Sequence, residues 1–311
     1  MNRRLVDSMR ASQHGFVLFV TICSLVYLAP LRLTNGEERT VSLSLVVSDT
    51  ELLVCDSLPY KLVVWNRTNS SVQLRNVKSQ PKTQVIQYLE CRYRDKDWDV
   101  IREVSADKAG KFMGDLVVEG NSRFAFYGQF FLKDNRDCVF SEPREYELRI
   151  RLSCLLGEFA TEPRRINVKK RPVSEVASLT NSRKLLELIL SPMSQSSLLE
   201  ETKSIQKTLH SGAARKTMDL RVMTQHFKET GKILEKDLGI LAAYTVAADG
   251  LDEVRRDVAT SDFIWIAHQR KEWADLAKLL DNLKEDSNVR RTFAGELENA
   301  VQLGLYRPEK P

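Results

Sequence analysis

Between residues 40 and 170 the hydrophobic positions recur every second residue, which is the period of a half-buried β-strand. The clearest run is 145–154, EYELRIRLSC, where apolar and charged residues alternate. This alternation predicts that one set faces a core and the other faces solvent; the apolar set is Tyr146, Leu148, Ile150 and Leu152. Further strands are predicted at 40–48, 60–65, 87–94 and 123–132.

The run 123–132, RFAFYGQFFL, has aromatic residues at both odd and even positions. A strand that is apolar on both faces is covered on both faces. We therefore expect one face of this strand to lie in the β core and the other to pack against the helical part of the chain, with a partner protein as the alternative. Turn residues separate the predicted strands, and this number and spacing favour an Ig-like antiparallel β-sandwich.

From about residue 171 the hydrophobic period becomes helical. One apolar stripe consists of Val176, Leu179, Leu186 and Ile189, and another of Trp273, Leu276, Ala277, Leu280 and Leu283. Polar residues at Asn181–Ser182, Ser261–Asp262 and Ser287 predict helix starts. The segment 168–172, VKKRP, is basic and ends in proline, so we expect a short hinge there.

The predicted fold class is therefore multi-domain, all-β plus all-α. An N-terminal Ig-like antiparallel β-sandwich occupies 40–170 and an α-helical bundle domain of about six helices occupies 172–306, followed by a tail at 307–311.

Residues 1–36 have the pattern of a signal peptide or an N-terminal membrane anchor. Arginines at positions 3, 4 and 10 precede the uncharged stretch 15–31, GFVLFVTICSLVYLAPL. This stretch is longer than most secretory apolar regions and shorter than most transmembrane helices. Thr34 and Gly36 are small residues that fit cleavage after Gly36. Cleavage is the favoured interpretation, and retention as an anchor through 15–31 is the alternative.

Composition narrows the class of protein. A chain of 311 residues that is 42% hydrophobic and 29% charged has enough apolar surface for two folded domains and is not a disordered chain. The net charge of +5 comes largely from the arginines of 1–36. No basic stripe remains in the rest of the sequence, so we expect no nucleic-acid partner. The membrane is expected to contact only the N-terminal segment.

Four cysteines follow the export segment: Cys55, Cys91, Cys138 and Cys154. An even number fits disulfide formation in the oxidising space that export would reach. Four cysteines allow three pairings, and the sequence does not choose among them. We predict at least one disulfide, and the alternative is four buried free thiols.

Two stretches resemble bacterial exported proteins of unknown function that carry an Ig-like β-sandwich domain. The stretch 41–66, which contains LLVCDSLPYKLVVWN, resembles their opening strands, and 141–152, SEPREYELRIRL, resembles their penultimate strand. The resemblance extends more distantly to BsuPI-type proteinase-inhibitor domains. The family usually has Gly-Glu at the kink where this chain has Cys55-Asp56.

The resemblance also implies a role for Tyr146, that of a tyrosine corner whose hydroxyl bonds to upstream backbone. Antibody domains have a cysteine two residues later, where this chain has Leu148, so no antibody-type bridge is implied. The resemblance carries no catalytic motif, and it does not extend to the helical part.

The sequence offers little for catalysis. The histidines after the export segment are His210, His226 and His268, without a HExxH motif or a pair at helical i, i+4 spacing. His268 and Glu272 are one helical turn apart, and we interpret them as a pair on the solvent side. We predict no catalytic site.

No metal or cofactor site is predicted either. Asp95, Asp97 and Asp99 alternate beside Trp98, and such oxygen-rich alternation can bind calcium. The glycine and the terminal glutamate of an EF-hand loop are missing, so we interpret this stretch as a polar hairpin loop.

These observations predict an exported or membrane-anchored, non-enzymatic protein that binds a protein or has a structural role in the cell envelope. Its location is periplasmic or extracellular, or the cytoplasmic membrane if 15–31 is retained. The partner would be an envelope or extracellular protein. Two alternatives remain open: a proteinase inhibitor that acts through the loop 134–143, and a hydrolase whose site lies in the helical domain.

Overall fold

A computed structural model describes residues 41–75, 85–94, 96–105, 116–133, 137–190, 197–210, 212–243, 251–283, 285 and 287–308. The export segment predicted at 1–36 lies outside these residues. The chain from Val41 onward forms one compact unit. Within the described part, no helix combines the length and the apolar character that crossing a membrane requires.

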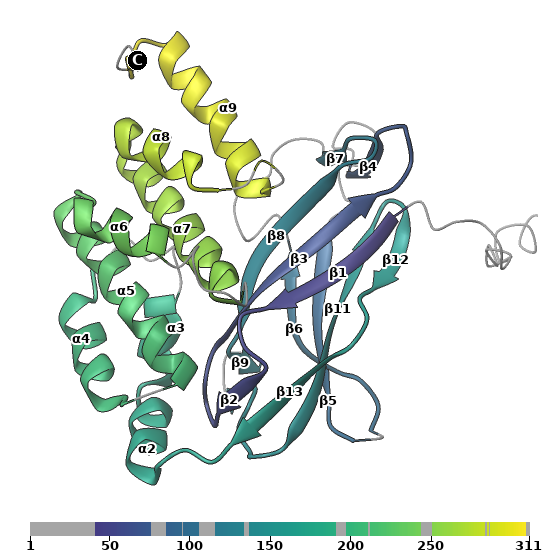
Figure 1. Cartoon of the computed structure of the whole chain (residues 1–311), viewed down its shortest axis with the longest axis vertical. Coiled ribbons are helices and arrows are strands. Elements are labelled where there is room, and N and C mark those ends of the chain that lie inside the picture. Colours follow the sequence, from purple (N-terminus) through teal and green to yellow (C-terminus); the bar gives the residue numbers. More distant parts are fainter. Residues whose placement is uncertain are drawn as a thin grey trace, which may run out of the picture. The chain divides into compact units, whose positions relative to one another are not determined.

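The N-terminal part of the described chain is mostly strands and the C-terminal part is helical, as predicted (Figure 1). One sheet has the strand order β1–β3–β8; another has the order β2–β13–β11–β5–β6, with β12 paired to β11; and β9–β10 and β4–β7 are small pairs. The pairing is antiparallel except between β2 and β13, which are parallel. The bounds are β1 Val41–Val47, β2 Glu51–Leu53, β3 Leu58–Asn66, β4 Val72–Arg75, β5 Ile86–Arg92, β6 Asp99–Ser105, β7 Leu116–Val118, β8 Arg123–Phe130, β9 Leu132–Lys133, β10 Asp137–Cys138, β11 Glu145–Cys154, β12 Gly157–Ala160 and β13 Arg164–Lys169.

Strand β11 has the two faces that its alternation predicts. Tyr146, Leu148, Ile150 and Leu152 are buried, whereas the residues between them are exposed or half-buried. These side chains belong to one hydrophobic cluster together with inward residues of β1, β3, β5 and β8. The two larger sheets therefore share a core.

The close contact between β3 and β8 depends on a glycine. Gly128 of β8 lies opposite Tyr60 of β3, and a Cβ at position 128 would stand 2.6–2.9 Å from atoms of the Tyr60 ring and hydroxyl. Tyr60 is only 2% exposed, so the ring has no free space to enter.

We expect Gly128→Ala to lower the free energy of unfolding by about 1–3 kcal/mol, because the added methyl group forces the Tyr60 ring from its packed position. Urea denaturation measures this change. The matched control is Gly295→Ala in helix α9, Asn288–Gln302, where a Cβ meets no atom and the better helix former should stabilise by up to about 1 kcal/mol. Equal effects of the two substitutions would contradict the packing argument.

The described part contains eight helices. Their bounds are α2 Val173–Asn181, α3 Arg183–Leu190, α4 Leu199–Thr208, α5 Gly212–Thr230, α6 Glu235–Ala243, α7 Leu251–Arg270, α8 Trp273–Asp281 and α9 Asn288–Gln302. Ser287 is the N-cap of α9, where its hydroxyl accepts from the backbone N–H of Arg290 at 3.3 Å, as predicted. The helix start predicted at Ser261–Asp262 is wrong, because both residues lie inside α7.

The physical reason for this error lies in side-chain hydrogen bonds. The Ser261 hydroxyl donates to the carbonyl of Asp257, one turn earlier, at 2.8 Å. Asp262 forms an ion pair with Arg221 of α5. Both side chains are therefore engaged with partners other than the backbone N–H groups that an N-cap residue would bind. The helix continues through them.

The helices contact the strands mainly through α7 and α9. Helix α7 packs on β1, β3 and β8, and α9 packs on β8. Tyr127 of β8 packs against the second hydrophobic cluster, whose residues are helical except for Leu283. Phe124 and Phe126 belong to the first cluster, which contains the inward residues of the strands and also residues of α2 to α5. The prediction that this aromatic strand faces two cores is confirmed.

Candidate functional site

A polar cluster, buried except for its histidine, is centred on an arginine of the segment that the sequence predicts to be a hinge. We call it the Arg171 cluster, and it consists of Asp56, Arg171, Glu175 and His210. The Arg171 side chain is fully buried, and its Nε donates to the carbonyl of Val54 at 2.8 Å. Its Nη1 lies 2.7 Å from Glu175 Oε2, and its Nη2 bonds to the carboxylate of Asp56. The guanidinium thus holds the connection between β13 and α2 against the β2–β3 turn.

Asp56 links this turn to the helices. Its carboxylate accepts from the backbone N–H of Leu53 at 2.8 Å and of Ala214, at the start of α5, at 3.0 Å. Burial raises the pKa of Asp56 to about 6, even though Arg171 and these two N–H groups favour the charged form. The carboxylate is therefore a proton-binding group in the junction between strands and helices.

Glu175 connects the cluster to the surface. Its Oε1 lies 2.9 Å from Nδ1 of His210, whose side chain is 80% exposed. Burial alone would raise the pKa of Glu175, but the hydrogen bonds from His210 and Arg171 outweigh it and lower the pKa. The arrangement is a clamp in which one cation satisfies two buried carboxylates.

The structure brings two of the four predicted disulfide cysteines together. Cys55 lies in the β2–β3 turn and Cys138 in β10, and their thiols share a hydrogen bond. Cys91 lies in β5, and Cys154 lies at the end of β11. None of the four is bonded to another in this structure.

The two neighbouring thiols differ in their acidity. The hydrogen bond from Cys138 lowers the pKa of Cys55, and it outweighs burial with the help of the Arg171 charge. The same hydrogen bond and burial raise the pKa of Cys138. Cys55 is thus the better nucleophile of the pair.

A second feature lies on the outer face of the larger sheet. We call it the arginine–aromatic face, and its residues are Tyr88, Glu90, Arg92, Trp98, Glu147, Arg149 and Arg151. The register places Arg151 opposite Tyr88, Arg149 opposite Glu90 and Glu147 opposite Arg92. The guanidinium carbons of Arg149 and Arg92 lie 4.1 and 4.6 Å from the Trp98 ring centroid, and that of Arg151 lies 4.2 Å from the Tyr88 ring centroid.

Carboxylates hold these guanidinium groups in place. Glu90 accepts from Nε of Arg149 at 2.6 Å and of Arg151 at 2.9 Å, and Glu147 accepts from Nε of Arg92 at 2.6 Å. The hydrogen bond from Arg92 holds the pKa of Glu147 below its usual range. The arginine side chains remain 26–33% exposed, whereas that of Glu90 is 4% exposed.

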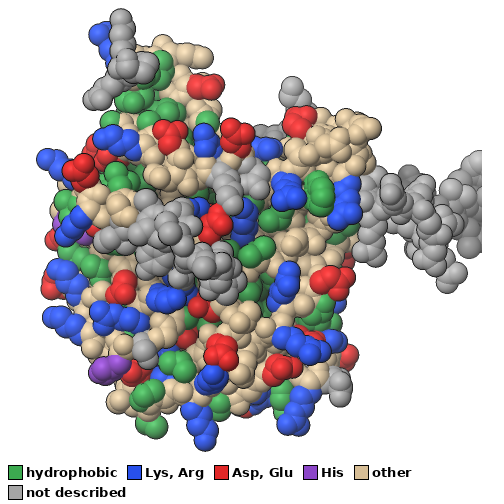
Figure 2. Space-filling view, viewed as in Figure 1, with side chains coloured by type: hydrophobic (Ala, Val, Ile, Leu, Met, Phe, Trp, Pro, Cys, Tyr) green, Lys and Arg blue, Asp and Glu red, His purple; other side chains and the backbone are tan. Residues whose placement is uncertain are grey.

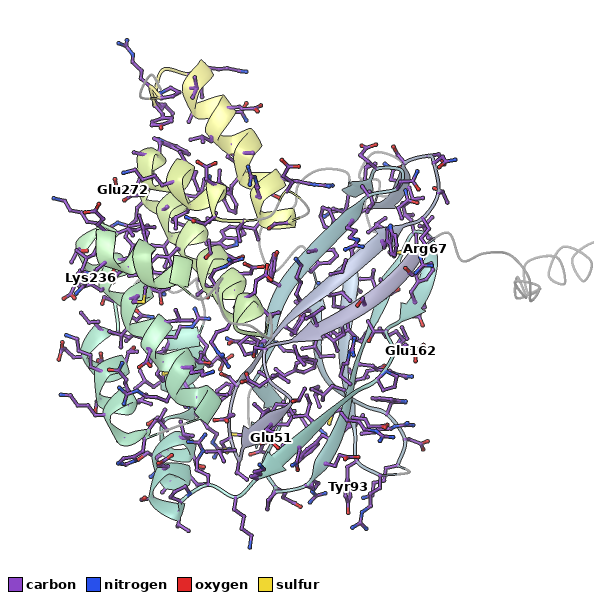
Figure 3. All side chains as sticks on the ribbon, in the orientation of Figure 1. Glu51, Arg67, Tyr93, Glu162, Lys236 and Glu272 are labelled. Atoms are coloured by element: carbon purple, nitrogen blue, oxygen red, sulfur yellow. The ribbon has the colours of Figure 1, made fainter. Side chains whose placement is uncertain are left out.

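Tyr93 lies directly after β5 (Figure 3), and the guanidinium carbon of Arg144 stacks 4.0 Å from its ring centroid. Tyrosine, tryptophan and arginine are the residues that concentrate at the centres of protein interfaces. Stacked and hydrogen-bonded arginines lose little conformational freedom when a partner binds. On the view in Figure 2, lysine and arginine side chains are interspersed with aspartate and glutamate.

The other sequence candidates lie apart. His268 contacts the rings of Trp273 and Phe293, and its nearest carboxylate is Glu296 at 3.9 Å. Glu272 lies beyond the end of α7 and donates its N–H to Ala267, so His268 and Glu272 do not share a helix. His226 lies in α5 and His210 in the Arg171 cluster. Over the described ranges, no group of three or more His, Cys, Asp or Glu could hold a metal ion.

Two predicted loops are described only in part. In the candidate calcium loop, Asp99 forms an ion pair with Lys133, and Asp95 lies outside the described residues. In the candidate inhibitory loop 134–143, residues 134–136 lie outside them, and Cys138, Val139 and Phe140 are buried. Phe140 packs edge-on against Tyr146 with ring centroids 5.5 Å apart.

The Arg171 cluster and the arginine–aromatic face are absent from the sequence predictions. From the sequence pattern alone, the charged residues of VKKRP and the outward residues of 145–154 are predicted to be solvent-exposed. A local signal exists for each. Arg171 and Glu175 have the i, i+4 spacing of a helical ion pair, and aromatic residues accompany the alternating charges of 87–98.

Comparisons with known proteins give no family. No family model matches the chain, and no curated protein matches it. Among solved structures, the sporulation control protein Spo0M from Bacillus subtilis has 11% identity and a TM-score of 0.30, over 48% of this chain and 56% of that one. The C-terminal domain of wzt has 9% identity and a TM-score of 0.28, over 43% of this chain and 77% of that one.

A β-glucosidase from Listeria innocua in complex with isofagomine has 11% identity and a TM-score of 0.24, over 42% of this chain and 16% of that one. The chain thus spans about half the length of Spo0M. Likenesses of this size carry no argument about function.

Proposed function

We propose that this chain is an exported, non-enzymatic protein that binds a protein partner of the cell envelope or the extracellular space. Residues 1–36 deliver it as a signal peptide, or 15–31 retain it in the cytoplasmic membrane. The strand-rich part is an Ig-like β-sandwich, and the helical part is a bundle that packs on it. The arginine–aromatic face is the contact surface.

Two observations support the Ig-like interpretation of the strands. The two larger sheets share one hydrophobic cluster. The hydroxyl of Tyr146 donates to the carbonyl of Glu142 at 3.2 Å, which is the upstream backbone bond of a tyrosine corner. Such a fold typically presents a rigid surface for binding.

The observation that carries the binding proposal is the set of guanidinium groups fixed over aromatic rings on a half-exposed sheet face. Glu90 is buried beneath Arg149 and Arg151, so these guanidinium groups are oriented before any partner arrives. A partner that presents carboxylates or backbone carbonyls fits such donors. Among the described residues of this face, no nucleophile lies beside a base and an orienting group.

In vivo photo-crosslinking of the full chain tests the proposal. A photoactivatable residue replaces Arg151 on the face in one variant and Glu298, exposed on α9, in the control. We expect one defined adduct from position 151, in the envelope or extracellular fraction, and none from position 298. Adducts from both positions alike, or a full-length product in the cytosol, would contradict the proposal.

Single substitutions on the face should weaken this contact. We expect Trp98→Ala to raise the dissociation constant of the crosslinked partner about tenfold or more, because Arg92 and Arg149 lose the ring that orients them. Surface plasmon resonance with the purified pair measures this change. Arg307→Ala, an exposed arginine near the C-terminus, is the control and should leave the affinity unchanged.

A further inference from the structure

The geometry points to a single disulfide between Cys55 and Cys138, with Cys91 and Cys154 remaining free thiols. The inference rests on the proposed export only for the compartment in which the oxidation occurs. The pairing itself follows from contacts within the described part of the chain.

The backbones of the two cysteines are held side by side. The N–H of Cys55 donates to the carbonyl of Phe140, two residues after Cys138, at 2.8 Å. Cys138 pairs with Leu132 in the small β9–β10 sheet. The two thiols share a hydrogen bond, and both residues are nearly buried, with 5% and 7% exposure. Contact between the two thiols is the starting geometry that a disulfide requires.

The backbone at Cys55 gives a second, independent argument. Its φ is +63°, in the left-handed region that glycine adopts without strain and that other residues adopt rarely. A cysteine here accepts a conformational cost that a glycine would avoid. An interaction of the cysteine side chain must offset this cost. The Cys55 sulfur lies beside Cys138, so we take the interaction to be with that thiol.

The register removes Cys154 from every pairing. Cys91 lies opposite Leu148 on β11, and Cys154 lies six residues farther along that strand, about 20 Å away at the rise of a β-strand. Phe140 packs on Tyr146, at the start of β11, so the Cys138 segment lies near the end of β11 that is remote from Cys154. A disulfide requires Cα atoms within about 7 Å. Cys91 is left without a disulfide partner because the thiol that interacts with Cys55 is that of Cys138.

The chemistry is thiol–disulfide exchange with an external disulfide, either a small molecule such as oxidised glutathione or an exchange protein. The Cys55 thiolate attacks one sulfur of the external disulfide, whose S–S bond breaks and releases one thiolate. Cys138 then loses its proton and attacks the Cys55 sulfur of the mixed disulfide, which expels the second thiolate. Two protein thiols are oxidised, one external disulfide is reduced to two thiols, and the two protons pass to the leaving groups.

The local environment assigns Cys55 to the first step. Arg171 and the Thr180 hydroxyl favour its thiolate, and Cys138 supplies a hydrogen bond to it. Cys55 and Cys138 are nearly buried, so the external disulfide reaches Cys55 through a local opening of the β2–β3 turn. The bond then joins this turn to β10 beside the Arg171 cluster.

Oxidation of the full chain in glutathione buffer tests the pairing. All variants carry Cys23→Ser, so that only four thiols remain. After oxidation, free thiols are alkylated under denaturing conditions and the peptides are mapped by mass spectrometry. We expect a Cys55–Cys138 linkage, with Cys91 and Cys154 alkylated. Alkylated Cys55 and Cys138, or a linkage that includes Cys91 or Cys154, would overturn the inference.

Matched serine variants give a second readout. Cys55→Ser and Cys138→Ser should each abolish the linkage and the rise in melting temperature on oxidation, whereas Cys91→Ser and Cys154→Ser should keep both. An equal response of all four variants would contradict the pairing.

The same mapping on protein from the producing cells separates this inference from the proposed function. A pair that forms in glutathione buffer but is reduced in the cell counts against export and leaves the pairing intact. An exported protein whose Cys55 and Cys138 are reduced overturns the pairing and leaves export intact.

Discussion

Arg171→Met is expected to lower the free energy of unfolding by about 3–5 kcal/mol at neutral pH, since it removes the cation from a fully buried group of charges. Asp56 and Glu175 then remain as buried carboxylates without the guanidinium that both contact. The carbonyl of Val54 also loses its donor. Urea denaturation of the variant and the parent protein measures the change.

Two controls separate the charge from the position in the chain. Lys170→Met changes the exposed neighbour of Arg171 and should alter stability by less than about 0.5 kcal/mol. Arg171→Met combined with Asp56→Asn and Glu175→Gln removes the uncompensated charges, so it should recover part of the loss. A single Arg171→Met variant as stable as Lys170→Met would contradict the role of the clamp.

The elements that sequence predicts well are those whose pattern repeats over several residues. In the alternation of 145–154 and in the aromatic run 123–132, many positions indicate the same pattern of burial. One exceptional residue therefore does not change the predicted strand. Helix starts depend on single polar side chains. Ser287 caps α9, but Ser261 bonds one turn back within α7, and nothing local distinguishes the two.

The junction between strands and helices could not be predicted because its partners are distant in sequence. Arg171 in VKKRP resembles an exposed linker residue until Asp56, 115 positions away, is placed beside it. The cysteines show the same limit. Their even number predicts oxidation, but only the fold places β10 beside the β2–β3 turn and so selects Cys55 and Cys138.

The arginine–aromatic face can be predicted from the sequence only in part. The outward direction of Arg149 and Arg151 follows from the strand period alone. Their stacking on Trp98 and Tyr88 depends on the register between β5 and β11 and on the segment before β6, which the sequence does not specify. A surface that the sequence describes only as charged is therefore an ordered array of cations and rings.

The second large effect concerns pH. Folding raises the pKa of Asp56 from its ordinary value of 3.8 to about 6. Between these two pH values the folded protein holds a proton that the unfolded chain has released, so stability falls as pH rises from about 4 to about 6. The contribution is complete below pH 3.8 and is lost as pH passes 6. A pKa difference of about 2 corresponds to about 3 kcal/mol.

Asp56→Asn isolates this contribution, because the amide does not titrate. The N–H groups of Leu53 and Ala214 bond to different oxygens of the carboxylate, so one of them loses its acceptor in the variant, and this loss does not depend on pH. Burial also raises the pKa of Asp257 and Asp262, and the hydrogen bonds of Glu175 lower its pKa, so the stability of the parent protein at any pH is a sum over several groups. The contributions of the other groups cancel in the difference in unfolding free energy between parent and variant. From about pH 4 to about pH 6.5 this difference should shift against the parent by about 2 kcal/mol, which is most of the full contribution. Asp97→Asn replaces an exposed acid and is the control. If the difference in unfolding free energy between the parent and Asp56→Asn stays constant across this pH range, Asp56 does not bind the proton.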